Sequence, residues 1–450
     1  MIDGKSVTLK TIFWTGCEDI SGFQTNSKKW SNILFSILDG SVSIAFSRRY
    51  RKVPQGTLPQ GTLHFFGGGS VEQNKKGTGT TKKEQAQQLT DMVVSVKFVD
   101  NSGSLSWSFT VTISRSRLVD AAVSRWYHCI SRCVRRAHLM GDEAAPGRKD
   151  WIENRLKELD QIFAVSVGGF SLMDNHLHLL LRIDPEVASS WSDSEVVERW
   201  FRLFPPRGSD RKPMKVSKEM VAARVGNMEW VASARKRLSS LGWFMKCLKE
   251  PLARMANKQD KCTGAFFEGR FKSIAILDEE SLVSVCAYID LNPVAAGVAA
   301  TPEASEYTSI KARVEHVVSN GRAEDLKAAE LGSVEAVRVS GGLEDELWLV
   351  PVEDRRGLGA VREGMRSGFT LGQYVMLVEY TGRMLRDGKA AISVEVADVF
   401  ARLGCTPETW GVRMSKLAGG RLLGRFLAAT RDKLRELAGK LQVRHLANVG

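Results

Sequence analysis

The chain has 450 residues, a formal net charge of +13 and a pI near 9.4. It is too long for one ordinary hydrophobic core, so two or three domains are expected, and its positive field favours a nucleic acid over a neutral metabolite as partner. The chain has no run of 18 or more apolar residues, which excludes a membrane span, and its seven cysteines are spread out with no secretory signal before them. We therefore expect a cytoplasmic protein with reduced thiols.

The first 114 residues contain many breakers of regular structure. Proline and glycine recur at 54–63, three glycines follow at 67–69, and 72–88 is a polar run. Such segments bury little apolar surface, so the sequence predicts a poorly ordered N-terminal extension over 1–114. Alternating apolar residues from Leu105 to Ile113 indicate one strand within it.

From residue 115 the pattern changes to that of a compact α+β unit. Periodicity predicts strands at 125–132, 164–172 and 175–183, with an amphipathic helix at 151–163 between the first two. The turn Met173-Asp174 is short, so the second and third strands are expected to form an antiparallel hairpin.

A helical insertion is predicted at about 190–236. It would hold a helix at 192–204, a basic loop at 205–213 and a helix at 216–236, followed by a further helix at 238–258. Four basic residues of that last helix, Lys246, Lys249, Arg254 and Lys258, are most simply explained as a solvated face.

The next elements complete the unit. A strand is predicted at 264–277, which would place Arg270 and Lys272 on one face, and Asp278 is a good N-cap for a helix at 279–291. The resulting order is that of a split βαβ antiparallel sheet, similar to the ferredoxin-like fold. We expect helices on one face of this sheet and a more open second face that holds a site.

Two histidines mark that second face. His176 and His178 alternate on the predicted central strand, so their imidazoles point the same way and both can reach one ion. On the last helix Tyr288 and Asn292 are four residues apart and share one side. A polar strand face and an ordinary helix end would explain the same residues without any metal. Cys129 and Cys133 do not suggest a zinc site, because no second close pair of cysteines follows.

Four blocks in this order resemble the single-tyrosine HUH transposases, and most closely those associated with repetitive extragenic palindromes. The blocks are WYHCISR at 126–132, MDNHLHLL at 173–180, EGRFKS at 268–273 and YIDLNPVAAG at 288–297. The resemblance covers about 115–313 and implies an HUH nuclease domain there. It implies that His176 and His178 bind a divalent ion, Mg²⁺ or Mn²⁺, that Asn292 completes the metal site, and that Tyr288 is the nucleophile. Members of the family commonly carry proline where this chain has Asp174.

The resemblance also implies a reaction and its partners. Tyr288 would attack a phosphate of single-stranded DNA bearing a hairpin or palindromic repeat, leaving a 5′-phosphotyrosyl link that a second 3′-hydroxyl can reverse. Joining two ends uses two sites, so a homodimer is expected. Basic residues near the site are predicted to contact DNA phosphates: Arg132, Arg135, Arg136, Arg270 and Lys272.

Two other functions are open. One is a DNA-binding protein on the same fold without catalysis, including a domesticated transposase. The other is a replication initiator or relaxase-type nickase, which the absence of a P-loop motif disfavours. After residue 314 the chain is expected to be helical, with helices over 371–386 and 421–441 and a capped start at Thr406-Pro407, and to add DNA contacts or self-association.

Overall fold

The computed structural model describes five short strands within 1–114, then residues 119–141, 146–330, 342–387, 393–418 and 426–427. The chain divides into two compact units, Met1–Ser114 and Arg115–Gly450. No helix among the described residues combines the length and apolar character that a membrane crossing requires.

The first unit contains two small antiparallel sheets. One is made of β1 (Val7–Thr8), β2 (Asn32–Leu38) and β3 (Ser41–Ser47), and the other of β4 (Ser95–Asp100) and β5 (Gly103–Ser108). β5 overlaps the strand predicted from Leu105 onward. The breaker-rich segments at 54–63, 67–69 and 72–88 lie outside the described residues.

The second unit is built on one sheet with the order β10-β9-β6-β8-β7. Its four main strands are β6 (Trp126–Arg132), β7 (Val165–Leu172), β8 (His176–Ile183) and β9 (Lys272–Ile276), and all pair antiparallel. The two-residue β10 (Phe426–Leu427) adds a parallel edge. In chain order the main strands are arranged 4-1-3-2, which is the arrangement of a split βαβ sheet in an α+β protein.

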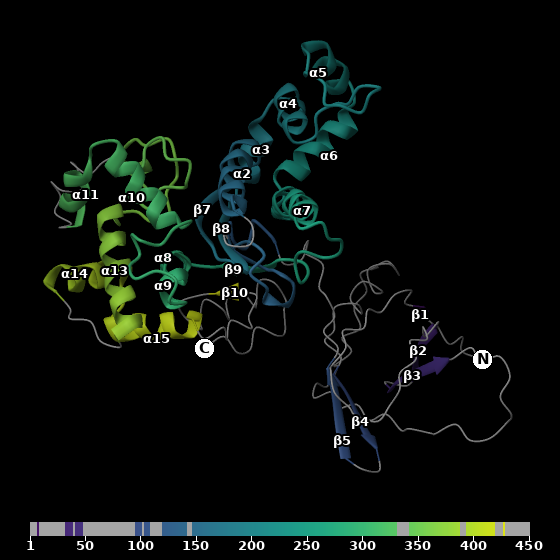
Figure 1. Cartoon of the computed structure of the whole chain (residues 1–450), viewed down its shortest axis with the longest axis horizontal. Helices are drawn as coiled ribbons and strands as arrows, with labels where there is room; N and C mark the ends of the chain where they lie inside the picture. The colour runs from purple at the N-terminus through teal and green to yellow at the C-terminus, as the bar shows by residue number, and fades with distance from the viewer. Residues whose placement is uncertain are drawn as a thin grey trace, which may run out of the picture. The chain divides into compact units, whose positions relative to one another are not determined.

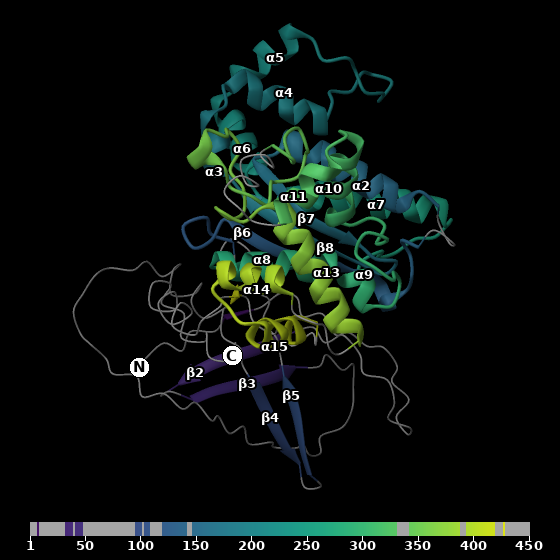
Figure 2. The same cartoon turned by 90° about the vertical axis from the view of Figure 1, so that its left-hand side faces the viewer.

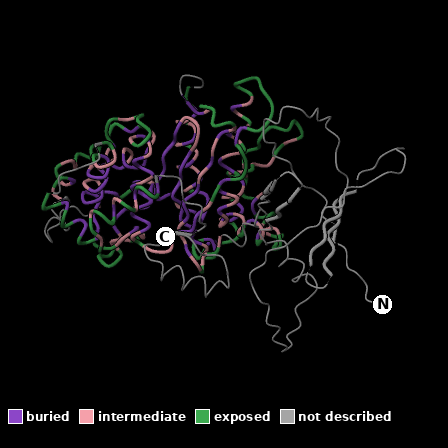
Figure 3. The backbone as a smooth tube through the Cα atoms, turned by 90° about the horizontal axis from the view of Figure 1, so that it is seen from below, coloured by how far each residue is buried: buried purple, intermediate pink, exposed green. Residues whose placement is uncertain are grey.

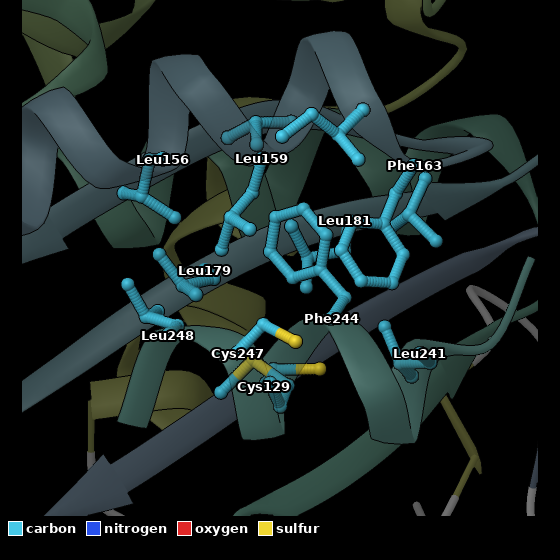
Figure 4. Packing of buried hydrophobic residues seen from close by; sticks show 14 of the residues in the cluster. Cys129, Leu156, Leu159, Phe163, Leu179, Leu181, Leu241, Phe244, Cys247 and Leu248 are labelled. Carbon is cyan, nitrogen blue, oxygen red and sulfur yellow. The ribbon is translucent and has the colours of Figure 1, made fainter. Parts of the chain in front are cut away.

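One face of the sheet is covered by α2 (Arg148–Ile162) and α7 (Leu241–Gln259). Figure 4 shows Leu156 and Leu159 of α2 and Phe244 of α7 packed over Leu179 and Leu181 of β8. These side chains belong to the larger hydrophobic core. Figure 3 shows buried residues throughout the interior of the second unit and exposed residues on its outer loops. Because alternate residues of β8 point to opposite faces, Leu177, Leu179 and Leu181 fill this core, and the histidines face the other way.

The second face of the sheet is covered as well. It is packed by α8 (Glu279–Asp290) and, behind it, by α10 (Ser309–Ser319) and α13 (Leu371–Asp387), which together form a second core. Figure 1 shows these helices on the opposite side of the sheet from α2 and α7. The expectation of an open second face was therefore wrong, because the C-terminal helices close over α8 instead of standing apart from it.

The remaining C-terminal elements are short. They are α9 (Asn292–Ala295), α11 (Ala323–Glu330), η3 (Arg356–Leu358), α14 (Val394–Leu403) and α15 (Pro407–Ala418). The Thr406 hydroxyl caps α15 by accepting from the Thr409 amide at 3.2 Å, as the sequence predicts. The helix expected over 421–441 lies outside the described residues.

The insertion between β8 and α7 contains α3 (Pro185–Ser190), α4 (Asp193–Leu203), α5 (Lys218–Val225) and α6 (Met228–Leu238). Figure 2 shows α4 and α5 projecting from the sheet. The single helix expected over 216–236 is two helices, because Asn227 breaks it by accepting from the Trp230 amide at 3.0 Å as the N-cap of α6. The strand expected over 264–277 is also shorter, since only Lys272–Ile276 pairs with β6.

Candidate active site on the sheet

The two strand histidines are held by the register of β8 against β6. His176 lies opposite Arg132 and His178 opposite Ile130. Residues directly paired across strands point to the same face, so Arg132 accompanies the histidines on the side that α8 covers. His178 is only 2% exposed, whereas His176 is half-buried at the edge of the site.

Helix α8 brings Tyr288 to this face. The Tyr288 ring centroid lies 5.6 Å from that of His178, and the two rings meet edge to face. The helix begins with Asp278, whose carboxylate accepts from the Ser281 amide at 2.8 Å, as predicted for its N-cap. The tyrosine predicted from the sequence therefore lies beside the predicted histidine pair.

Asn292 lies near both Tyr288 and His176, the more exposed of the two histidines. Burial raises the pKa of the Tyr288 phenol and lowers that of the His176 ring, and the nearby Asn292 side chain acts against both shifts. Its Nδ2 is also 3.3 Å from the Tyr288 carbonyl oxygen, one turn back along the chain. The four residues predicted to form the site are thus brought together by β8, α8 and the start of α9.

A third histidine also lies at this site, although the sequence analysis did not assign it there. His128 of β6 has its Nε2 2.8 Å from Nδ1 of His178, and their rings stack with centroids 5.1 Å apart. Both rings are buried. The register places His128 opposite Leu180, two residues from His178 on the same face. Period-two alternation suggests the face, but only the strand pairing places His128 next to His178.

The imidazole tautomers suit a metal ion. Nδ1 of His176 is 2.6 Å from the amide oxygen of Asn175, and since that oxygen only accepts, Nδ1 carries the proton and Nε2 keeps its lone pair. Nε2 of His178 is buried with no hydrogen-bond partner among the described residues. Burial lowers the pKa of His176 to about 4, so the ring is neutral at pH 7.

The residues that could hold a divalent ion here are His176 and His178, through imidazole nitrogens, and Asn292, through its amide oxygen. Over the part of the chain that the structure describes, no group of three or more His, Cys, Asp or Glu side chains is arranged to hold a metal. The candidate site has neutral ligands only, which leaves coordination positions for a substrate. Asp174, in the turn before the histidines, is paired with Lys149 at 2.7 Å.

The phenol of Tyr288 needs activation. Burial raises its pKa, whereas the Asn292 side chain and the positive charge of Arg132 act in the opposite direction. Arg132 also disfavours protonation of His176. A guanidinium in this position can stabilise a tyrosinate or a phosphate anion.

The other predicted basic contacts lie at the rim. Lys272 begins β9 and is exposed. Ile130 of β6 pairs with Lys272 on one side and with His178 on the other, so the three residues point to the same face of the sheet. Arg135 and Arg136 are exposed, with positive φ of 54° and 55°, in η2 (Val134–Arg136) directly after β6. The Arg136 carbonyl accepts from Asn175 Nδ2 at 3.2 Å, which joins this turn to the histidine strand.

Arg270 does not share a strand face with Lys272, because β9 starts after it. It is exposed in the loop that leads into that strand. Cys129 and Cys133 are both fully buried in the larger core and are not disulfide-bonded.

A buried carboxyl anchors α8 from behind. Asp290 accepts from the Ile310 amide at 2.9 Å and from the hydroxyls of Ser309 and Tyr374. The carboxyl is fully buried, and burial raises its pKa. These contacts tie the helix that carries Tyr288 to α10 and α13. The sequence shows Asp290 only as an apparent interruption of an apolar helix face.

Comparisons with known proteins give little further information. No protein-family model matches the chain, and no curated protein matches it. One solved structure, described as a REP-associated tyrosine transposase bound to a REP hairpin, aligns with 44% of this chain and 81% of its own, at 10% identity and a TM-score of 0.26. A similarity this low supports no conclusion about the fold or the chemistry.

Proposed function

We propose that this protein is a metal-dependent DNA strand transferase, a transposase of the single-tyrosine HUH type. The proposal rests on one observation above all. The Asn292 side chain lies close enough to the phenol of Tyr288 and the imidazole of His176 to act on both pKa values, beside a buried His178 nitrogen that has no hydrogen-bond partner among the described residues. A nucleophile next to a set of metal ligands is the arrangement that cleavage through a covalent intermediate requires.

In the reaction the Tyr288 oxygen forms a bond to phosphorus and the bond from phosphorus to the 3′ oxygen breaks. The products are a 5′-phosphotyrosyl link and a free 3′-hydroxyl, so the phenol proton is balanced by the proton on the leaving oxygen. An Mg²⁺ or Mn²⁺ ion held by His176, His178 and Asn292 would supply polarisation of the phosphate. Attack by a second 3′-hydroxyl reverses the step and rejoins DNA without ATP.

The surrounding charges fit a single-stranded DNA substrate. Arg132 offsets negative charge at the phenol, and the exposed rim of Arg135, Arg136, Arg270 and Lys272 holds the phosphate backbone. A hairpin or palindromic repeat is the proposed recognition element, and two sites in a homodimer allow two ends to be exchanged.

The test is incubation of the purified full chain with labelled single-stranded hairpin DNA from around its own gene, with Mg²⁺ or Mn²⁺, and a denaturing gel. The wild type is compared with Tyr288→Phe, which removes only the hydroxyl. Tyr380→Phe is the matched control, because Tyr380 is a buried tyrosine of α13. A DNA-protein adduct that needs the ion, persists in Tyr380→Phe and vanishes in Tyr288→Phe is expected.

Binding without any adduct, over several flanking sequences and both ions, would instead support a non-catalytic DNA-binding protein. An adduct that survives in Tyr288→Phe would show that another residue is the nucleophile.

A further inference from the structure

The positive charge of this protein is concentrated in one segment. Residues 204–259 contain 13 lysines and arginines against 4 aspartates and glutamates, a formal charge of +9, whereas the whole chain carries +13. The segment spans the loop after α4, helices α5 and α6, and α7. Most of these basic side chains are exposed, so the field reaches solvent. Charge of this density attracts a polyanion.

Aromatic rings of this segment gather around Trp200 of the preceding helix α4. The Trp200 ring lies 5.0 Å from Phe204, 5.8 Å from Trp230 and 5.6 Å from Trp243, between ring centroids. Phe204 is 42% exposed and the three tryptophans are half-buried. These four rings therefore leave aromatic surface in contact with water, although they also pack α4, α6 and α7 together.

Three cations lie over these rings. The Arg237 guanidinium is 4.8 Å from the Trp243 centroid, Lys246 Nζ is 4.5 Å from the same ring, and Arg224 is 4.8 Å from Trp230. None of the three forms an ion pair with a carboxylate within the described segments, although Arg235 and Arg254 nearby do. Aromatic rings hold the cations in place without cancelling their charge.

We infer that this insertion surface, formed by Phe204, Arg224, Trp230, Arg237, Trp243 and Lys246, binds single-stranded nucleic acid. Unpaired cations can contact successive phosphates, while the exposed Phe204 ring and the guanidinium planes offer stacking faces for unpaired bases. A duplex presents phosphates but keeps its bases stacked inside, so the aromatic part of the surface gains little from it.

The insertion surface is distinct from the site on the sheet. Helix α7 packs on the face opposite to His176 and His178, and the insertion joins the larger core on that side. Figure 1 shows α4, α5 and α6 beyond α2 and α7, with α8 across the sheet from them. The binding is therefore independent of the Tyr288 chemistry, and the two proposals can fail separately.

The experiment measures binding of a fluorescein-labelled oligo(dT) 20-mer and a duplex of equal length to the full chain by anisotropy, in EDTA so that no cleavage occurs. The triple variant Arg224→Gln/Arg237→Gln/Lys246→Gln keeps the aliphatic stems and removes three charges. The matched control is Lys327→Gln/Arg383→Gln/Lys416→Gln, three exposed cations of α11, α13 and α15. Circular dichroism checks that both are folded.

We expect the insertion variant to bind the single strand roughly tenfold more weakly and to lower the slope of log K against log salt by about 2, since each phosphate contact contributes about 0.7 to that slope. Phe204→Ala should lose roughly fivefold or more through stacking, and the conservative Arg237→Lys/Lys246→Arg should bind like the wild type. The control triple should match the wild type.

Equal binding and an equal salt slope for the insertion variant and the wild type would overturn the proposal. A folded protein that binds the duplex as tightly as the single strand, with no effect of Phe204→Ala, would overturn the single-strand preference. Loss of cleavage in Tyr288→Phe with unchanged oligo(dT) binding would support the catalytic proposal and would show that the two sites act separately.

Discussion

Replacing His128 by phenylalanine tests how the inner histidine of the proposed metal site is oriented. His178 keeps a lone pair on Nε2 only if its Nδ1 carries the proton and donates it to His128 Nε2, 2.8 Å away. Phenylalanine preserves a ring at this fully buried position but cannot accept. His178 Nδ1 is then left unpaired, which costs about 1–3 kcal/mol.

The same change should weaken the metal site, because loss of a partner that orients a ligating histidine typically lowers affinity about 10- to 100-fold. Mn²⁺ binding is measured by electron paramagnetic resonance of the free ion, and stability by urea unfolding without metal. His138→Phe, at an exposed histidine, is the control. If His128→Phe bound Mn²⁺ as tightly as the wild type and unfolded at the same urea concentration, the contact between the two rings would have no orienting role.

Three further changes test the fold around the site. Tyr374→Phe removes a hydroxyl donor from the buried carboxyl of Asp290 and should lower the free energy of unfolding by about 1–3 kcal/mol in urea. Burial raises the pKa of Asp160 to about 6; the native state then binds more protons than the unfolded one between about pH 4 and 6, so stability falls as pH rises through that range. Asp160→Asn should therefore be more stable than the wild type by up to about 3 kcal/mol at pH 7 and equal to it near pH 3, when unfolding is followed across pH. Gly168→Ala would place a Cβ 2.5 Å from the Trp126 ring and should cost about 1–3 kcal/mol through overpacking, read as a lower melting temperature.

Much of this fold can be predicted from local periodicity in the sequence. The alternation in β8 places Leu177, Leu179 and Leu181 in one core and His176 and His178 on the other face, and the four-residue spacing predicts that Tyr288 and Asn292 lie on one side of the chain. These features depend on neighbours along the chain. They are visible before any pairing of strands is known.

Features that depend on strand pairing or on distant segments are not visible in this way. The contact between His128 and His178 requires the register of β6 against β8, and β9 is short because only Lys272–Ile276 finds a partner in β6. The break between α5 and α6 is a local feature, but a single residue, the N-cap Asn227, produces it. The residues around it continue a helical pattern, so the sequence predicts one helix. The second core needs α13, which lies about 80 residues beyond α8 in the sequence.

The C-terminal helices help to fix the position of Tyr288. Asp290 lies two residues after Tyr288 and so points to a different side of α8, where Ser309, the Ile310 amide and Tyr374 supply its donors. A buried carboxyl without these donors is costly, so α8 takes this position only when α10 and α13 are folded against it. The position of Tyr288 over the sheet therefore depends on the region after residue 314. This region is therefore part of the structure that holds the candidate site together.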